Sequence, residues 1–288
     1  MKNNRIIIGT ANFGGNYGNF RHSKITLGAI EEIINTAQQN GIDHFDTAKS
    51  YGDTELILGK FLNKSQPIYI DTKIGAPECR SIDSILTAIK ESLNKLGIPK
   101  LNTLYLHNSE LLSGEQSAIT KGGMEKVIEL GLADHLGVSV YTLDELTKAK
   151  SNFPLLSNFQ IIENICDRRL IKLRELMDLT YLGNVVNIRS VFLQGLLLAN
   201  VKDLPNKFQS AANSIESLNK YANESGVSIL DLCIAYVKQI PWVGSYLIGV
   251  ESTLQLKEIL ESNFELKDNW EEYIFSLPTD LKDPRFWL

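Results

Sequence analysis

The sequence predicts a (β/α)8 barrel. Eight short apolar segments, each typical of a strand, alternate along the chain with segments whose apolar residues recur at helical spacing. Strict alternation favours a parallel sheet, and eight units is the number that closes such a barrel. An open doubly wound sheet is the alternative, but no Gly-x-Gly-x-x-Gly pattern follows the first strand. We therefore expect residues 1–288 to form one barrel domain with a short C-terminal tail.

The strands are predicted from runs rich in Ile, Val, Leu and Tyr that end at polar residues or glycine. The first run, RIIIG, is apolar at consecutive positions, which is typical of a strand buried on both faces. The predicted strands are residues 5–9, 42–46, 68–73, 103–107, 135–140, 158–161, 185–189 and 243–249.

The helices are predicted from apolar residues three and four positions apart, with glycine or a capping residue at the ends. Ile85, Ile89 and Leu93 form the clearest such face, and Asp53 is expected to cap the helix that follows the second strand. The predicted helices are residues 27–40, 54–62, 83–96, 124–130, 143–148, 168–177, 209–223, 228–239 and 254–261. The tail is expected to pack, because Phe286 and Trp287 are costly to leave in water.

The composition excludes several classes of protein. Hydrophobic residues make up 43% and charged residues 22%, as in ordinary globular proteins. No apolar run of about 18 residues indicates a membrane span, and the N-terminus does not read as a signal peptide. Cys79, Cys166 and Cys233 lie far apart, which predicts free thiols in the cytoplasm and no metal site. With a net charge of -5 and scattered basic residues, nucleic acid is not an expected partner.

Seven of the eight predicted strands end at a polar side chain, and the eighth ends at a glycine. The eight positions are Thr10, Asp46, Lys73, His107, Ser139, Gln160, Arg189 and Gly249. In a barrel these ends meet at one mouth, where ligands bind, and Tyr51 lies in the loop beyond Asp46. Taken singly, a strand-end Asp is more often a cap or an ion-pair partner, and a lone Lys, His or Tyr has equally ordinary explanations. Three ionisable groups at the ends of three consecutive strands favour a site.

Together these groups are suited to protonating a carbonyl oxygen. A phenol has a pKa of about 10, and a nearby ammonium lowers it. We expect Lys73 to act in this way on Tyr51, Asp46 to hold Lys73, and His107 to bind the substrate oxygen or relay a proton. Reduction of the carbonyl also needs a hydride, which no side chain supplies, so a nicotinamide cofactor is implied.

The same residues stand in recognisable motifs. DTAKSYGDTELILG spans residues 46–59, and TK, LYLHN, GVSVY and IGVESTLQLKEIL follow it in order. Over nearly its whole length the chain resembles the aldo-keto reductases, for which the motif around Tyr51 is specific. The resemblance implies that Asp46, Tyr51, Lys73 and His107 are the catalytic tetrad, with Tyr51 as the proton donor. The segment near the start of the chain that reads GTANFG at residues 9–14 and NYG at residues 16–18 is also similar to family members associated with bacterial surface-polysaccharide pathways.

The resemblance further implies a nicotinamide cofactor across the barrel mouth, NADPH with NADH as the alternative. The implied cofactor-binding residues are Thr10, Ser139, Gln160, Arg189, Ser190, Gly195, Gly249, Ser252, Gln255 and Glu258. Three positions depart from the family pattern. Val140 replaces an Asn, Arg189 replaces an aromatic residue that stacks on the nicotinamide, and Glu251 lies where a basic residue often binds the 2′-phosphate. A guanidinium can also stack on a π-system.

The expected function is reduction of an aldehyde, ketone or sugar by a monomer or small homo-oligomer. Two alternatives remain. One is a nicotinamide-binding regulatory or interaction subunit with slow turnover, which the intact tetrad disfavours. The other is a barrel lyase with Lys73 as a Schiff-base nucleophile, which Asp46 disfavours because a paired carboxylate keeps a lysine protonated.

Overall fold

Eight parallel strands close into a barrel. The computed structural model describes residues 5–15, 24–170 and 174–287. Each strand pairs in parallel with the next, and β1 pairs with β8 to close the ring. The strands are β1 (Ile6–Gly9), β2 (His44–Asp46), β3 (Tyr69–Ile74), β4 (Leu101–Leu106), β5 (Ala133–Val140), β6 (Asn158–Ile162), β7 (Val185–Arg189) and β8 (Ser245–Ile248). This confirms the predicted (β/α)8 architecture.

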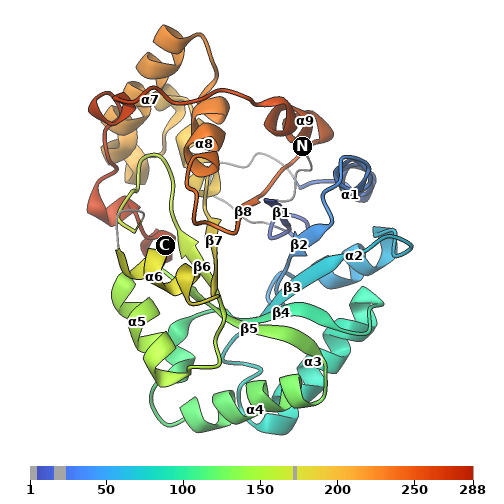
Figure 1. The fold of residues 1–288 in the computed structure, drawn as a ribbon. Helices are drawn as coiled ribbons and strands as arrows, with labels where there is room; N and C mark the ends of the chain where they lie inside the picture. The colour runs from blue at the N-terminus through green and yellow to red at the C-terminus, as the bar shows by residue number, and fades with distance from the viewer. Residues whose placement is uncertain (1–4, 16–23, 171–173, 288) are drawn as a thin grey trace.

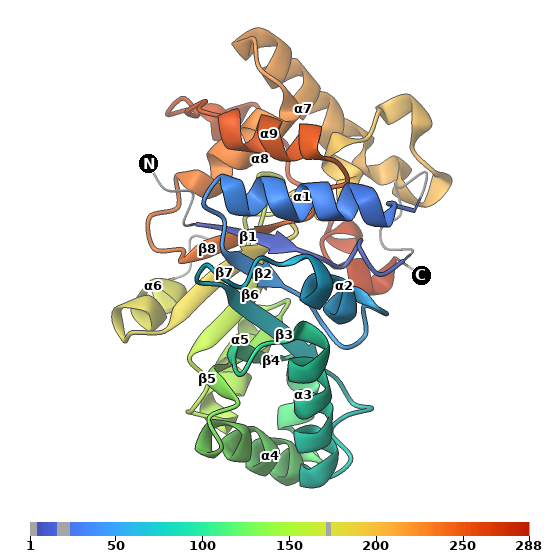
Figure 2. The same cartoon turned by 90° about the vertical axis from the view of Figure 1, so that its right-hand side faces the viewer.

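Helices surround the strands (Figure 1). In the described residues they are α1 (Leu27–Gln39), α2 (Thr54–Phe61), α3 (Ile82–Leu96), α4 (Ser117–Glu129), α5 (Leu143–Asn152), α6 (Arg174–Tyr181), α7 (Ala212–Ser225), α8 (Ile229–Lys238) and α9 (Thr253–Glu261). The first helix and the last lie side by side across the seam where β1 meets β8 (Figure 2). Ile30, Ile33 and Ile34 are the buried face of α1, as the helical spacing predicts.

Two predicted helices differ most from the observed ones, whereas the differences at α5, which extends to Asn152, and at α7, which begins at Ala212, are smaller. Helix α4 begins at Ser117, seven residues before the predicted start, and runs through Gly122 and Gly123. A Cβ at Gly123 would lie 2.3 Å from Cδ1 of Ile85, so this glycine permits the close packing of α4 on α3. The helix predicted at residues 168–177 is observed only from Arg174, and residues 171–173 lie outside the described residues.

The barrel interior is polar, whereas the outer faces of the strands are apolar. Thr103, Asn158 and Asn187 are buried inside, and Asn158 Nδ2 donates to Thr103 Oγ1 at 2.8 Å. The outer faces carry residues such as Leu104, Val138 and Ile161, which are fully buried against the helices. Parallel strands of this kind are apolar where helices cover them. The inward-facing strand positions are therefore filled by hydrogen-bonded polar side chains and not by an apolar core.

A charge pair lies near the amino end of the barrel. His44 Nε2 is 2.9 Å from Oδ2 of Asp71, and Asn102 Nδ2 donates to the other carboxylate oxygen at 2.7 Å. Burial lowers the pKa of His44, but the Asp71 carboxylate outweighs it and leaves that pKa raised. Burial also acts on Asp71, yet His44 and Asn102 leave the pKa of its carboxyl lowered. Each group therefore favours the charged form of the other, and the pair stabilises the folded state.

We expect His44→Gln to lower the free energy of unfolding by about 1.5–3 kcal/mol near pH 6, the loss for a hydrogen bond to a charged group. Because the folded pKa of His44 is raised, its contribution is complete below about pH 6.5, the unfolded value. It disappears as the pH rises through the folded pKa. Urea denaturation of both proteins at pH 6 and pH 9 measures this. An equal difference at both pH values would contradict the pairing.

The C-terminal tail packs against the barrel, as predicted, but only in part. Trp287 is buried and meets the Phe208 ring edge-on, with 4.9 Å between the ring centroids, whereas Phe286 is 75% exposed.

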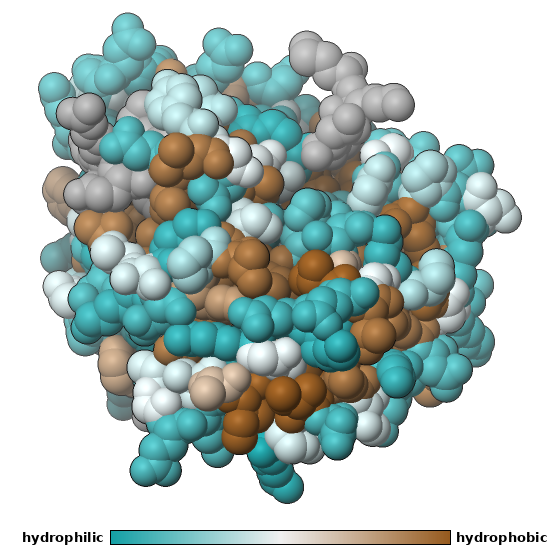
Figure 3. Space-filling view, turned by 60° about the horizontal axis from the view of Figure 1, so that its bottom comes forward, coloured by the Kyte–Doolittle hydropathy of each residue, from teal (hydrophilic) through white to brown (hydrophobic). Residues whose placement is uncertain are grey.

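Asp53 occupies the N-cap position of α2, but its side chain makes no capping hydrogen bond, contrary to expectation. None of the helices in the described ranges has the length and apolar character needed to cross a bilayer. The face in Figure 3 mixes hydrophilic residues with smaller hydrophobic areas.

Candidate active site

A cavity of about 1040 Å³ opens at the carboxyl ends of the strands. All four residues predicted as catalytic line it, and so do most of those predicted to bind the cofactor. They are Thr10, Asp46, Tyr51, Lys73, His107, Ser139, Gln160, Arg189, Ser190, Gly195, Gly249, Gln255 and Glu258. Ser252 is the exception, because it does not line the cavity and instead caps α9 by accepting a hydrogen bond from the Gln255 N–H at 3.2 Å.

Asp46 and Lys73 form a buried ion pair at the base of the cavity. Lys73 Nζ donates to Oδ1 of Asp46 and, at 3.3 Å, to the carbonyl oxygen of Thr47. Both side chains are almost fully buried. Burial raises the pKa of the Asp46 carboxyl, and the Lys73 ammonium opposes that rise. The carboxylate therefore holds a lysine inside the barrel, as the sequence predicts.

The loop that carries Tyr51 is held by a second loop. A Cβ on Gly14, beyond β1, would lie 1.7 Å from the carbonyl oxygen of Tyr51, so no other residue fits there. Gly52 has a φ of +61° and packs against Gly14 in turn. The Thr54 hydroxyl donates to the same Tyr51 carbonyl at 2.7 Å, which fixes the start of α2. These contacts explain why glycine is needed at both Gly14 and Gly52.

Tyr51 and His107 lie together above the ion pair. Their ring centroids are 5.9 Å apart in an edge-on arrangement, and Lys73 Nζ lies 5.9 Å from the Tyr51 ring centroid. Ser50 Oγ is 3.4 Å from Nδ1 of His107, a contact that sequence reasoning did not identify. The phenol and the imidazole therefore face one cavity, with an ammonium beneath them.

The electrostatics differ in one respect from the expectation. Burial lowers the pKa of His107 to about 4, with further lowering by Lys73 and Arg189, so the imidazole is neutral at neutral pH. Burial raises the pKa of Tyr51, as does the Asp46 carboxylate, while Arg189 is the cation that lowers it. Lowering of the phenol pKa by Lys73, as expected from sequence, is not observed, because Asp46 sits directly on the ammonium.

Gln160 and Ser139 lie on neighbouring strands at the same level. Gln160 Nε2 donates to Oδ2 of Asp46 at 2.6 Å, so the amide is oriented by the ion pair. Its Oε1 atom is buried and has no hydrogen-bond partner among the described residues. A buried acceptor without a partner calls for an explanation, and a ligand with an N–H group would supply one.

The far end of the cavity is acidic. Asp203, Glu251 and Glu258 line it, and all three are exposed. Gln255 lies beside them, with its side-chain oxygen accepting from the Glu251 N–H at 2.7 Å. The basic residues that line the cavity in the described part of the chain are Lys73, His107, Arg189 and Arg285, and none of them lies in the segment 251–258.

The loop after β7 is strained. Ser190, Leu193 and Gln194 have φ values of 62°, 48° and 54°, in the left-handed region that residues other than glycine rarely adopt. Such strain tends to concentrate at functional sites, because surrounding structure must hold it in place. Ser190 and Gly195 were predicted to bind the cofactor, and this loop lines the cavity.

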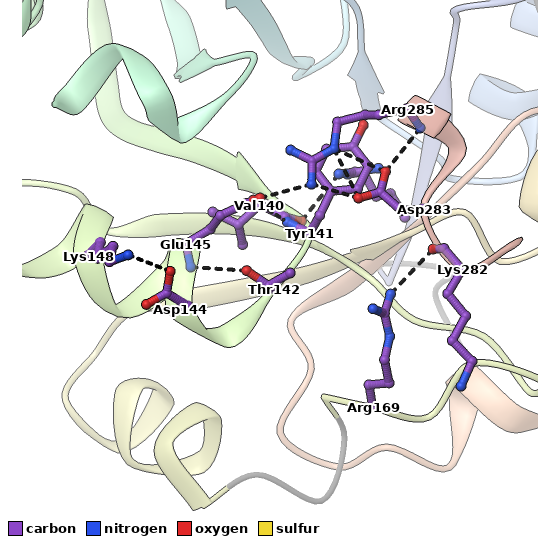
Figure 4. A network of polar contacts seen from close by, with 11 residues as sticks. Val140, Tyr141, Thr142, Asp144, Glu145, Lys148, Arg169, Lys282, Asp283 and Arg285 are labelled. Atoms are coloured by element: carbon purple, nitrogen blue, oxygen red, sulfur yellow. Dashed lines mark hydrogen bonds and ion pairs between the residues drawn. The ribbon is translucent and has the colours of Figure 1, made fainter. Parts of the chain in front are cut away.

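Sequence reasoning missed a wall of the cavity built around Tyr141. The guanidinium carbons of Arg189 and Arg285 lie 4.2 Å and 3.7 Å from the centroid of this one ring. Arg285, in the tail, donates to Asp283 at 2.6 Å and to Glu145 at 2.9 Å (Figure 4). The sequence contains no local signal that a residue so far along the chain reaches α5. No group of three potential metal ligands occurs in the described residues.

The comparisons with known proteins agree with this geometry. The profile of the Aldo/keto reductase family matches residues 5–276. The chain is 26% identical over 192 residues to the oxidoreductase sirO of Leptosphaeria maculans, an alignment covering 61% of this chain and 57% of that protein. It is 24% identical over 262 residues to D-arabinose 1-dehydrogenase of Saccharomyces cerevisiae, covering 83% and 78%.

Among solved structures, the glycerol dehydrogenase of Gluconobacter oxydans superposes with a TM-score of 0.72 at 20% identity. The superposition covers 93% of this chain and 89% of that one, which establishes a shared fold. The family profile spans nearly the whole chain, including every strand of the barrel. The chain therefore belongs to the aldo/keto reductase family.

Proposed function

We propose that the protein reduces the carbonyl group of a small molecule, an aldehyde, ketone or sugar, to an alcohol with NAD(P)H. The observation that carries the proposal is the convergence of Tyr51, His107 and the Lys73–Asp46 pair on one cavity at the carboxyl end of the barrel. Active sites of such barrels lie at this end. A phenol and a neutral imidazole that face one cavity can bind and protonate a carbonyl oxygen.

Each residue has a distinct task in this proposal. The neutral imidazole of His107 donates a hydrogen bond to the carbonyl oxygen and orients it toward Tyr51. Tyr51 gives its proton to that oxygen as negative charge develops there. Arg189, the cation that lowers the phenol pKa, favours the phenolate that remains, and the Lys73–Asp46 pair lies beneath the Tyr51 ring. Burial of the pair keeps water away, which strengthens these interactions.

The cavity residues suit a nicotinamide dinucleotide. When bound, this cofactor supplies the hydride for the reduction. The buried Oε1 of Gln160 lacks a partner and would accept from the carboxamide, with Ser139 beside it. The loop carrying Ser190 and Gly195 would hold the phosphates, and Gln255 and Glu258 would meet the adenosine. Thr10 and Gly249 would line the path between them.

The preference between NADH and NADPH is expected to depend on the carboxylates of Asp203, Glu251 and Glu258, which line the cavity. A carboxylate near the adenosine ribose favours the free 2′-hydroxyl of NADH and repels the 2′-phosphate of NADPH. We therefore propose that the protein binds both dinucleotides, with at most a modest preference for NADPH. Titration of protein fluorescence with NADH and NADPH tests this. If neither binds at millimolar concentration, the reductase proposal fails.

We expect Glu251→Lys to raise the affinity for NADPH relative to NADH by about threefold to tenfold, since exposed charge pairs each contribute up to about 1 kcal/mol. Reversing the charge replaces a repulsive contact by an attractive one. Glu261→Lys is the matched control, because it makes the same change at the other end of α9. The ratio of the two dissociation constants is the measurement. An unchanged ratio would place the 2′-phosphate elsewhere.

The alternative of a regulatory subunit with slow turnover predicts dinucleotide binding without appreciable carbonyl reduction. The buried ion pair beneath Tyr51 favours the enzyme, because a binding subunit has no need for a costly buried charge there. Three buried free cysteines, Cys79, Cys166 and Cys233, support a reducing cytoplasmic location. Association with surface-polysaccharide pathways and a monomeric or small oligomeric state stay predictions.

A further inference from the structure

Ser50 lies beside His107 in the catalytic cavity. Its Oγ is 3.4 Å from Nδ1 of the imidazole, and both residues line the cavity. This contact is the only side-chain hydrogen bond that His107 makes within residues 5–15, 24–170 and 174–287. The other ring nitrogen, Nε2, therefore has no hydrogen-bond partner in that part of the chain and is left for a ligand.

The backbone holds the two residues at this separation, although they are 57 positions apart in the chain. The loop after β2 is tied to β3, because the Thr47 N–H donates to the carbonyl oxygen of Asp71 at 2.8 Å. The His107 N–H donates to the carbonyl oxygen of Ile74, at the end of the same strand, at 2.9 Å. Ser50 and His107 are thus both anchored to β3, which fixes their separation before any ligand binds.

The substrate determines which ring nitrogen must carry the proton. In the proposed reaction His107 donates a hydrogen bond to the carbonyl oxygen, which can only accept. A neutral imidazole has one N–H, and burial, Lys73 and Arg189 all lower the pKa of His107 and keep it neutral. Because Nδ1 faces Ser50, the donor to the substrate is Nε2–H. Nδ1 then has a lone pair that needs a donor of its own, and the Ser50 hydroxyl is placed to be that donor.

We propose that Ser50 is a positioning residue, whose hydroxyl donates to Nδ1 of His107 and keeps the imidazole proton on Nε2, where the substrate carbonyl needs it. The inference rests on the proposed reductase function and adds a residue to it. The tautomer of an imidazole is set by the hydrogen bond that its other nitrogen makes. Without the hydroxyl, the tautomer protonated at Nδ1 becomes accessible, and that form turns a lone pair toward the carbonyl oxygen. Cofactor and substrate that fill the cavity exclude water, which strengthens the Ser50–His107 bond.

Ser50→Ala is expected to lower kcat/KM for a good aldehyde by about threefold to tenfold, the range for one hydrogen bond between neutral groups. Dinucleotide affinity should stay the same, because Ser50 acts on the group that binds the carbonyl. Ser50→Thr keeps a hydroxyl and should retain most of the rate. Ser65→Ala is the matched control, since Ser65 lies in an exposed turn before β3 and does not line the cavity. It should leave kcat/KM unchanged.

A double-mutant cycle separates action through His107 from direct contact with the substrate. His107→Ala removes the ring that Ser50 would orient, and its low residual rate is measured under single-turnover conditions. Adding Ser50→Ala to this variant should then cost little further rate. The same fold loss in both backgrounds would show that Ser50 acts on the substrate or on folding, and would overturn the inference.

Nitrogen NMR of protein labelled with ¹⁵N-histidine reads the tautomer directly and does not depend on turnover. The chain has four histidines, so the His107 signals are those that disappear in His107→Ala. We expect the wild-type ring to be protonated at Nε2. Ser50→Ala should shift the Nδ1 resonance and populate the second tautomer, whereas Ser65→Ala should change neither. A proton on Nδ1 in the wild type, or identical His107 signals in wild type and Ser50→Ala, would overturn the inference.

The spectra also separate this inference from the reductase proposal. If the wild type reduces no carbonyl compound, the reductase proposal fails, and a tautomer that changes in Ser50→Ala still supports the role of Ser50 toward His107. If wild type and Ser50→Ala reduce an aldehyde with the same kcat/KM and give the same His107 signals, the reductase function stands and the role of Ser50 is refuted.

Discussion

Tyr51→Phe is expected to lower kcat by about 10²–10⁴-fold, the contribution of a general acid, or roughly 3–5 kcal/mol of barrier. The substitution removes one oxygen and keeps the ring that meets His107 edge-on. The developing alkoxide then loses its proton source. Dinucleotide affinity should barely change, because the phenol acts on the substrate oxygen. Steady-state kinetics with a good aldehyde and a fluorescence titration measure the two quantities.

The matched control is Tyr69→Phe, which removes the same hydroxyl from an exposed tyrosine at the amino end of β3. It should leave kcat within about twofold of wild type, as expected for an exposed site distant from the chemistry. Thermal unfolding of both variants checks that neither is misfolded. A Tyr51→Phe protein that reduces the aldehyde at nearly the wild-type rate would make Tyr51 an ordinary loop residue.

Lys73→Met is expected to affect both stability and turnover. Removing one partner of a buried ion pair leaves the Asp46 carboxylate uncompensated and lowers the free energy of unfolding by about 3–5 kcal/mol. Asp46 can escape part of this cost by binding a proton, and burial already raises its pKa. A raised folded pKa stabilises the folded state at low pH and loses that effect as the pH rises. The variant should therefore be less destabilised at pH 5 than at pH 8.

The same substitution tests whether Lys73 works through Tyr51. Lys73 Nζ lies beneath the Tyr51 ring, 5.9 Å from its centroid. If its role is to stabilise the phenolate, adding Lys73→Met to Tyr51→Phe should cost little further kcat, because residues that act as a unit are not additive. A full additive loss would assign Lys73 an independent role. Asp46→Asn in the Lys73→Met background removes the orphaned charge and should restore part of the stability.

The barrel was predictable because its signals are local. Each strand is a short apolar run, and each ends at a residue whose place in the mouth follows from the parallel topology alone. Asp46, Lys73 and Gln160 therefore meet as predicted, although 114 residues separate Asp46 from Gln160. The start of α4 was missed for a local reason as well. Gly122 and Gly123 lower helix propensity, and the packing on Ile85 that requires Gly123 is a tertiary contact.

The rest of the site depends on contacts that sequence spacing does not encode. Arg285 reaches Glu145 from 140 positions away in the chain, and Tyr141 from 144, through a tail of irregular structure. The expectation that Lys73 lowers the pKa of Tyr51 was wrong for a related reason. Whether an ammonium lowers the pKa of a phenol depends on what else it touches, and Lys73 is already bound by Asp46. Motif spacing brings charges together but does not state which pair of them is in contact.

The most direct test of the account follows the hydride. The protein is incubated with NADPH or NADH carrying two deuterium atoms at C4 of the nicotinamide, together with a panel of aldehydes, ketones and sugars. Mass spectrometry of the products then locates the label. The account predicts an alcohol with one deuterium on the former carbonyl carbon from wild type, and at least a hundredfold less of it from Tyr51→Phe in the same time. Cofactor that binds but transfers no label to any carbonyl compound would contradict it.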